Sequence, residues 1–132
     1  MNGHAYGFNR ATGAVRWEYM GRAPFESGIA IVGGVGVSAN LAGDIVGLDA
    51  ETGVVRFSLS TGGSSVIEQV TADATCAYVS VAAIECIDPS GTVRWTSGGA
   101  SQGGPLYSTA VSTYGGRLYV GSFDGFHALK PQ

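Results

Sequence analysis

The chain has 132 residues, enough for one domain; 45% of them are hydrophobic and only 13% are charged. This apolar content excludes a disordered segment, because disordered chains are poor in apolar residues and rich in charge. A net charge of −3 without a basic stripe argues against nucleic-acid binding, and no apolar run is long enough for a membrane-spanning helix.

A period-2 pattern of apolar and polar residues predicts about 13 short strands and no helix. Pairs such as Gly33-Gly34, Gly115-Gly116 and Asp124-Gly125 mark tight turns between them. The expected strands span 4–9, 14–19, 28–32, 35–40, 44–49, 54–59, 66–71, 76–81, 83–88, 92–96, 106–112, 117–122 and 125–130.

One short string occurs three times along the chain. Its copies are Asn9–Trp17 (NRATGAVRW), Asp49–Phe57 (DAETGVVRF) and the one-residue-shorter Asp88–Trp95 (DPSGTVRW). The glycines of successive copies, and also their final aromatic residues, are 40 and then 38 residues apart. Self-similarity at this period is typical of repeat architectures, in which each repeat is one supersecondary unit.

The residue types of the string predict a turn followed by a strand. The opening Asn or Asp accepts hydrogen bonds within the turn, and the glycine adopts a positive φ that other residues resist. In the strand, Val15 and Trp17 are expected on one side and Arg16 on the other. The aromatic is expected to seal one repeat against the next. The structural positions of the three copies are Asn9, Gly13 and Trp17; Asp49, Gly53 and Phe57; and Asp88, Gly91 and Trp95.

The strands before the string repeat as well, so that one unit is predicted to be a four-stranded antiparallel sheet. The chain is expected to form a single domain, 1–132, with units at roughly 27–60 and 65–97 and a third made of 1–20 together with 106–132. The ends are out of phase: the chain opens with the last two strands of a unit and finishes with the first three. Segments 4–9 and 125–130 are both third-strand types, so one of them is surplus.

These motifs resemble the PQQ-like repeat of β-propellers. The resemblance is carried by Tyr119-Val-Gly-Ser, Asp124-Gly, Ala128-Leu and Asp49–Phe57, and the repeat covers almost the whole chain. The group includes quinoprotein dehydrogenases and an outer-membrane assembly lipoprotein of Gram-negative bacteria. It implies an all-β propeller of four-stranded blades, about three per chain, whose string aromatics pack against the neighbouring blade. Phe57 departs from the usual Trp, which is expected to weaken its seam.

Three blades are too few to close a propeller, since known rings have roughly four to eight. In one explanation, two chains form a six-bladed ring whose mixed blades combine one chain's C-terminus with the other's N-terminus. In the other, the sequence is a fragment of a larger propeller. The dimer is the favoured hypothesis.

The cellular compartment is left open. Met1–Tyr6 has neither the charged start nor the apolar centre of a signal peptide, so the chain as it stands is expected to stay in the cytosol. That expectation fails for a mature form or an excised fragment, and members of the resembled group are often periplasmic.

Cysteine and histidine give two further alternatives. Cys76 and Cys86 fall in neighbouring predicted strands, so they could form a hairpin disulfide or stay free as small buried hydrophobes. His4 and His127 hold equivalent repeat positions and would approach each other in a mixed blade, but the sequence offers no further metal-ligand pattern. We therefore expect half-buried strand residues and no metal.

The sequence holds no Gly-x-Ser-x-Gly elbow, phosphate loop or calcium loop, and no catalytic residue is assigned. The resemblance implies no quinone cofactor, because the vicinal cysteine pair of quinoprotein dehydrogenases is missing: Cys76 and Cys86 are not adjacent.

A ligand site is expected where inner strands and their entry loops face the channel. Its candidates are Glu26, Glu68, Gln69 and Gln102, of which Glu68 and Gln69 are polar residues in an otherwise apolar strand. The first functional hypothesis is a non-enzymatic binding or scaffold module that holds a protein or peptide. The alternatives are a hydrolase or oxidoreductase using the channel, and a propeller piece without a function of its own.

Overall fold

Thirteen strands form four separate antiparallel sheets in the computed structural model, which describes residues 3–62, 69–81, 83–98, 110–122 and 125–129. The first sheet pairs β1 (His4–Phe8) with β2 (Val15–Met20), and the last has the order β11 (Ser112–Tyr114), β12 (Arg117–Ser122), β13 (Gly125–Leu129). The second sheet contains β3 (Ala30–Val32), β4 (Val35–Ala39), β5 (Asp44–Asp49) and β6 (Val55–Ser60). The third contains β7 (Thr71–Ala72), β8 (Ala77–Val81), β9 (Ala83–Ile87) and β10 (Val93–Ser97).

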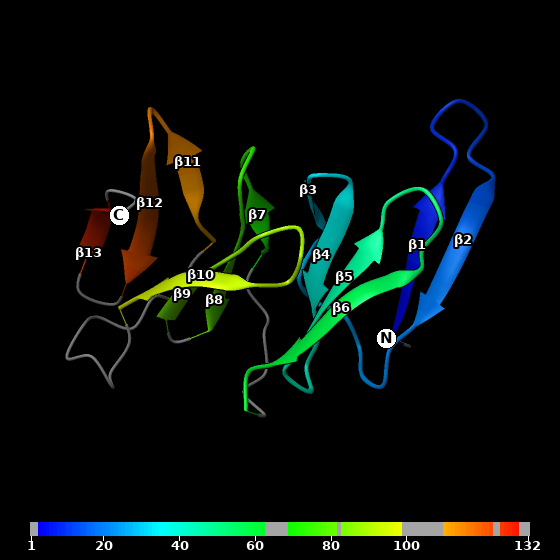
Figure 1. Ribbon diagram of the computed structural model, residues 1–132, viewed down its shortest axis with the longest axis horizontal. Helices are drawn as coiled ribbons and strands as arrows, with labels where there is room; N and C mark the ends of the chain where they lie inside the picture. The colour runs from blue at the N-terminus through cyan, green and yellow to red at the C-terminus, as the bar shows by residue number, and fades with distance from the viewer. Residues whose placement is uncertain (1–2, 63–68, 82, 99–109, 123–124, 130–132) are drawn as a thin grey trace.

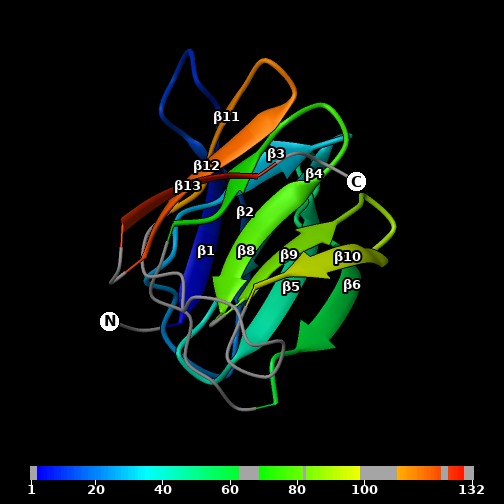
Figure 2. The ribbon, with the colours of Figure 1, turned by 90° about the vertical axis from the view of Figure 1, so that its left-hand side faces the viewer.

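The sheets follow one another in a row along the long axis, with the two incomplete sheets at opposite ends (Figure 1). Seen along that row, they overlap one behind another (Figure 2). Each is a meander, so its strand order in space is its order in the sequence. These are the four-stranded antiparallel blades that the repeat predicts. No helix in the described ranges is long and apolar enough to cross a membrane.

The core lies between successive sheets. One cluster joins the second sheet, through residues such as Val37 and Ile45, to Ala77 and Val79 of β8. A second cluster joins the opposite side of β8, at Tyr78, to β12 of the last sheet. Alternate residues of β8 thus serve two interfaces, which explains why the middle strands have near-continuous apolar sequences.

The strand bounds agree best with prediction in the second, third and fourth strands of each repeat. The first strands are shorter: β3 begins at Ala30, and β7 and β11 begin at Thr71 and Ser112. Much of the predicted strands 66–71 and 106–112 lies outside the described residues.

The expected alternation of Val and Arg after each turn is wrong. Phe8 pairs with Val15 and Gly7 with Trp17, so Arg16 is an extra residue in a β-bulge. The same skip occurs at Arg56 and Arg94. As a result Val15 is 57% exposed. The bulge turns both the valine and the arginine outward while keeping the aromatic over the sheet.

Candidate functional site

The three repeated turns are built on the same side-chain hydrogen bonds. Asn9 Oδ1 accepts from the backbone nitrogens of Ala11 and Thr12 at 2.9 and 3.2 Å. Asp49 accepts from Glu51 and Thr52 at 3.0 Å each, and Asp88 accepts likewise from residues 90 and 92. The turn glycines Gly13, Gly53 and Gly91 have φ of 72°, 73° and 86°. The hydrogen bond from Thr52 lowers the pKa of Asp49, and that from Ser90 lowers the pKa of Asp88.

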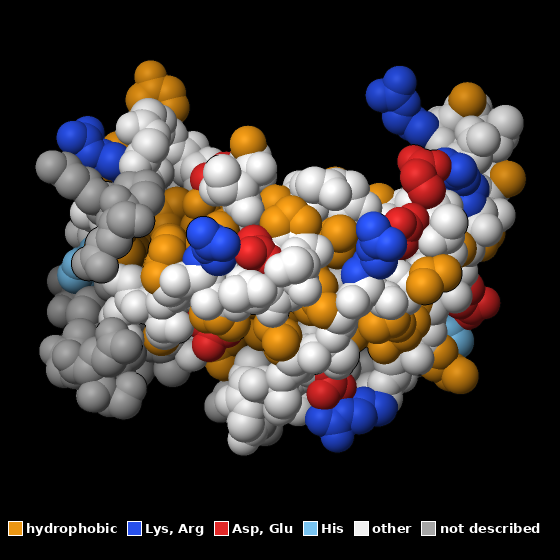
Figure 3. All heavy atoms as spheres, in the orientation of Figure 1, with side chains coloured by type: hydrophobic (Ala, Val, Ile, Leu, Met, Phe, Trp, Pro, Cys, Tyr) orange, Lys and Arg blue, Asp and Glu red, His pale blue; other side chains and the backbone are white. Residues whose placement is uncertain are grey.

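The bulged arginines pair with acidic side chains of these turns. Arg16 Nη2 lies 2.7 Å from Glu51 Oε2 of the next repeat, whereas Arg56 and Arg94 approach Asp49 and Asp88 of their own repeats at 3.9 and 3.5 Å. Figure 3 shows basic and acidic side chains beside one another on this face. We call Val15, Arg16, Glu51, Asp49, Val55, Arg56, Asp88, Val93 and Arg94 the turn row.

The seam between the first and second sheets and the seam between the second and third are each closed by an aromatic and a glycine turn. Trp17 lies across from Gly7 in its own sheet and under Gly53 of the next, so that a Cβ on either glycine would lie within 3 Å of the indole. The indole nitrogen donates to the Ala50 carbonyl at 3.0 Å. At the next seam Phe57 lies in the same way between Gly47 and Gly91.

Two hollows mark the ends of the row. The N-terminal hollow, about 280 Å³, lies between the first two sheets and is lined by Tyr6, Gly7, Trp17, Ile29, Ile31, Gly36, Leu48 and Ala50. The C-terminal hollow, about 460 Å³, lies over the third string aromatic and is lined by Asp73, Thr75, Cys76, Tyr78, Cys86, Asp88, Arg94 and Trp95.

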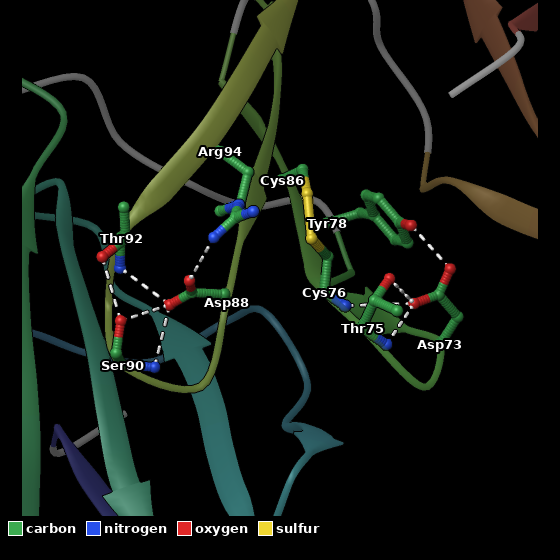
Figure 4. Close-up of a disulfide and its surroundings, with 9 residues drawn as sticks. All are labelled: Asp73, Thr75, Cys76, Tyr78, Cys86, Asp88, Ser90, Thr92 and Arg94. Carbon is green, nitrogen blue, oxygen red and sulfur yellow. Dashed lines mark hydrogen bonds and ion pairs between the residues drawn. A yellow bond between two sulfur atoms is a disulfide. The ribbon is translucent and has the colours of Figure 1, made fainter. Parts of the chain in front are cut away.

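The C-terminal hollow contains a disulfide and a strong hydrogen bond (Figure 4). Cys76 and Cys86 are bonded, with their Cα atoms 5.4 Å apart. Tyr78 Oη donates to Asp73 Oδ2 at 2.6 Å. Partial burial alone would raise the pKa of Asp73, but hydrogen bonds from Tyr78, Thr75 and Cys76 outweigh it and lower the pKa to about 2. Burial and the same carboxylate raise the pKa of Tyr78 to about 12.

The predicted channel residues are not brought into one described site. Gln69 lies just before β7, where its Oε1 accepts from the backbone nitrogen of Gly28 at 3.1 Å and thereby links two sheets. Glu26 is exposed. Glu68 and Gln102 lie outside the described residues.

The two histidines lie in different sheets. His4 Nδ1 contacts the Glu18 carboxylate, and His127 Nε2 is 2.8 Å from Ser122 Oγ. Within the described ranges, no group of three or more His, Cys, Asp or Glu side chains is arranged to hold a metal ion.

Sequence reasoning missed the Asp73–Tyr78 pair. The Asp73-x-Thr75 spacing, which places an acceptor near a turn, was its only signal. The position of Cys86 had a clearer sequence signal. Cys86 pairs with Trp95 in the way that Gly7 pairs with Trp17 and Gly47 with Phe57.

Stacked four-stranded meanders with an aromatic–glycine seam define a β-propeller of PQQ-like blades. The chain belongs to the family described as outer membrane protein assembly factor BamB, whose model matches residues 1–121.

Solved structures share this fold at low sequence identity. The crystal structure of BamB from Moraxella catarrhalis is 21% identical with a TM-score of 0.79, covering 97% of this chain and 39% of that one. The computationally designed Ika8 protein is 16% identical, with a TM-score of 0.77 and coverages of 98% and 40%. A europium-containing methanol dehydrogenase is 19% identical, with a TM-score of 0.61 and coverages of 70% and 21%. The chain thus spans about two fifths of BamB. None of the curated protein sequences compared with it matches.

Proposed function

We propose that this chain is a non-enzymatic, protein-binding scaffold module that acts in outer-membrane protein assembly. The observation that carries the proposal is its membership of the BamB family over residues 1–121. The fold supports it, because the repeated turns present the same pattern of exposed groups once per blade. The predicted ligand residues Glu26, Glu68, Gln69 and Gln102 remain a proposed ligand site at the mouth of the central channel.

The turn row is the surface that we propose for binding. Its arginine side chains are 47%, 59% and 63% exposed, so their ion pairs contribute little stability and can exchange partners. The valine beside each arginine offers apolar contact at the same spacing, with Val93 still 41% exposed. An extended protein segment with alternating apolar and acidic side chains fits such a row.

Fluorescence anisotropy with a labelled strand peptide of about 10 residues from an outer-membrane barrel protein tests this function. We expect saturable binding that weakens about tenfold when Arg16, Arg56 and Arg94 are replaced by glutamine, because the lost charges amount to roughly 1.4 kcal/mol. The matched control replaces Arg22 and Arg117, which are exposed outside the turn row, by glutamine. No binding at millimolar peptide, or an equal loss in the control, contradicts the proposal.

We also propose that the chain associates with a second copy, in which residues 1–20 and 106–132 complete one blade. A six-bladed ring of two copies is the simplest closed form. One chain corresponds to only 39% of BamB, so two copies contain fewer repeats than that protein. A closed ring of two copies must therefore curve more tightly than BamB. Light scattering at several concentrations tests the association, with twice 13.4 kDa expected for the ring.

A further inference from the structure

The two hollows lie beside the two incomplete sheets, one at each end of the row. We propose that the C-terminal hollow is the docking site for the Asn9–Gly13 turn of a second copy of this chain. The inference rests on the proposed self-association, and it names the surface and the turn through which that association occurs.

The closed seams supply the template. Over Trp17 lies the turn glycine Gly53, with a hydrogen bond from the indole to the backbone of that turn, and over Phe57 lies Gly91. Trp95 is the third aromatic of the series, and it contacts Tyr78 with ring centroids 5.9 Å apart. Among the described residues, its indole nitrogen has no hydrogen-bond acceptor and no glycine turn covers it. The hollow above it therefore lies where a further turn of this type belongs.

The chain carries one turn that is built for such a seat and does not occupy one. Gly13 has the φ of Gly53 to within a degree, yet a Cβ built on it meets nothing within 4 Å. In its turn Asn9 Oδ1 accepts a backbone hydrogen bond from the residue two positions later, as Asp49 Oδ1 does in the second turn. Of the three turns, only this one therefore has a free outer side in the described structure.

Charge favours the same match. The hollow contains the carboxylates of Asp73 and Asp88 and one arginine, Arg94, which gives it a net negative charge. Arg10 stands in the docking turn, at the position that Ala50 holds in the second repeat, and its side chain is exposed. Opposite charges steer such encounters and fix their register.

The N-terminal hollow lies on the other side of the blade that the two copies would complete. Ile29 and Ile31 are 41% and 55% exposed there, whereas Val70 and Val111, which stand at the position of Ile29 in the next two sheets, are 5% and 1% exposed. Those valines are covered by the second strand of the preceding sheet, and the first sheet has no such strand. β12 of the other copy is a second strand and supplies this cover.

Docking requires the β1–β2 hairpin to pair with β12 in place of β13. β13 pairs with β12 over five residues, and β1 would exchange for it along that edge. The exchange costs little side-chain burial, because each residue of β13 is exposed or half-buried and Phe126 is 94% exposed. The equivalent strand β5 has four buried residues in a row. The surplus third strand of the sequence is thus β13, and β1 replaces it in the assembly.

The deciding experiment replaces Gly13 by asparagine, which tolerates a positive φ but carries the Cβ that the seam excludes. In the separate chain this residue has open space, so at concentrations where the wild type is monomeric we expect an unchanged circular dichroism spectrum and melting temperature. In light scattering, we expect the dissociation constant for self-association to rise at least tenfold.

Gly53→Asn is the matched variant, because its Cβ collides with Trp17 inside one chain and should lower the melting temperature instead. Trp95→Phe keeps an aromatic in the hollow but removes the indole donor, and we expect severalfold weaker association. Either a dimer or a head-to-tail ladder in the wild type supports docking, provided that Gly13→Asn weakens it at least tenfold.

Wild-type self-association whose dissociation constant is unchanged in Gly13→Asn overturns the inference while leaving the proposed association standing. A wild type that is monomeric at all concentrations overturns both, and leaves the hollow to a repeat of a longer polypeptide. Binding of the strand peptide is measured separately, with the same affinity expected for Gly13→Asn. The scaffold function can therefore fail or hold independently.

Discussion

The seam at Trp17 and the open end at Trp95 contain the same string in two different surroundings. At the first, the indole is held between Gly7 and Gly53 and donates to Ala50. At the second, the ring faces a hollow of about 460 Å³. Each string therefore serves two seams: its aromatic contacts the next sheet, and its turn glycine covers the aromatic of the preceding sheet. A row of such repeats always ends with one unused aromatic and one unused turn.

The open end also differs in what lies beneath its aromatic. Cys86 stands where the closed seams have glycine, and it is tied to Cys76 across the sheet. Tyr78 fills the remaining space and is anchored by Asp73. The aromatic of the third sheet is therefore supported only by its own sheet, whereas Trp17 and Phe57 are also covered by the turn glycine of the next sheet.

The largest expected effect comes from a methyl group added at the closed seam. Gly53→Ala places a Cβ 2.7 Å from the Trp17 ring at a φ of 73°. Overpacking and the positive φ together should lower the free energy of unfolding by about 3 kcal/mol. Urea unfolding followed by circular dichroism measures it.

Gly13→Ala is the control for that experiment. It has the same backbone conformation and no neighbour within 4 Å, so it should cost only about 1 kcal/mol, the part due to φ. Equal losses in the two variants would mean that the turn over Trp17 contributes nothing specific to the seam.

The second effect is the loss of the disulfide in the third sheet. Reduction of Cys76–Cys86 should lower the free energy of unfolding by about 2–3 kcal/mol, because the closed loop is short. The double variant Cys76→Val, Cys86→Gly recreates the residues Val35 and Gly47 of the second sheet. Its stability should not respond to reductant, and a response there would show that the reductant acts elsewhere.

The sequence was sufficient for the repeat, the propeller class and most strands, because turn glycines and β-branched runs are local signals. It was insufficient for the bulge at Arg16, since the extra residue reveals itself only in the pairing of Gly7 with Trp17. The role of Gln69 was also hidden, because its acceptor bond joins residues 41 apart in the chain.

The candidate site was harder to predict than the fold. The hollow over Trp95 depends on which turn covers which aromatic, a relation between neighbouring sheets that no single repeat contains. The disulfide stayed open because the spacing of Cys76 and Cys86 fits both states. Aligning Cys86 with Gly7 and Gly47 would have shown that it lies beneath the aromatic.

A third and smaller effect is expected at the Tyr78–Asp73 hydrogen bond. Tyr78→Phe should lower the free energy of unfolding by about 1 kcal/mol at neutral pH, because a bond to a partly exposed carboxylate is lost. It should also raise the pKa of Asp73 from about 2 toward the ordinary 3.8.

The pH dependence follows from the lowered pKa of Asp73. The stability that it contributes is fully present above pH 3.8 and is lost as the pH falls toward about 2. The difference in stability between wild type and Tyr78→Phe should shrink over that window. A difference that is constant from pH 6 to about 2 would mean that the hydroxyl acts by packing and not through the carboxylate.

The smallest effect is a gain at the middle seam. Phe57 is the only one of the three string aromatics whose side chain has no hydrogen-bond donor. Its ring lies between two glycines, Gly47 and Gly91, as the ring of Trp17 lies between Gly7 and Gly53. Phe57→Trp should place an indole nitrogen near the carbonyl of Pro89, which holds the position of Ala50 in the repeat. We expect the free energy of unfolding to rise by about 0.5–1 kcal/mol, and Trp17→Phe to lower it by a similar amount.

If Phe57→Trp destabilises the chain instead, the one-residue-shorter turn at Asp88–Gly91 does not leave room for an indole. The Phe57 seam would then be built differently from the Trp17 seam, and the template for docking at Trp95 would rest on the Trp17 seam alone.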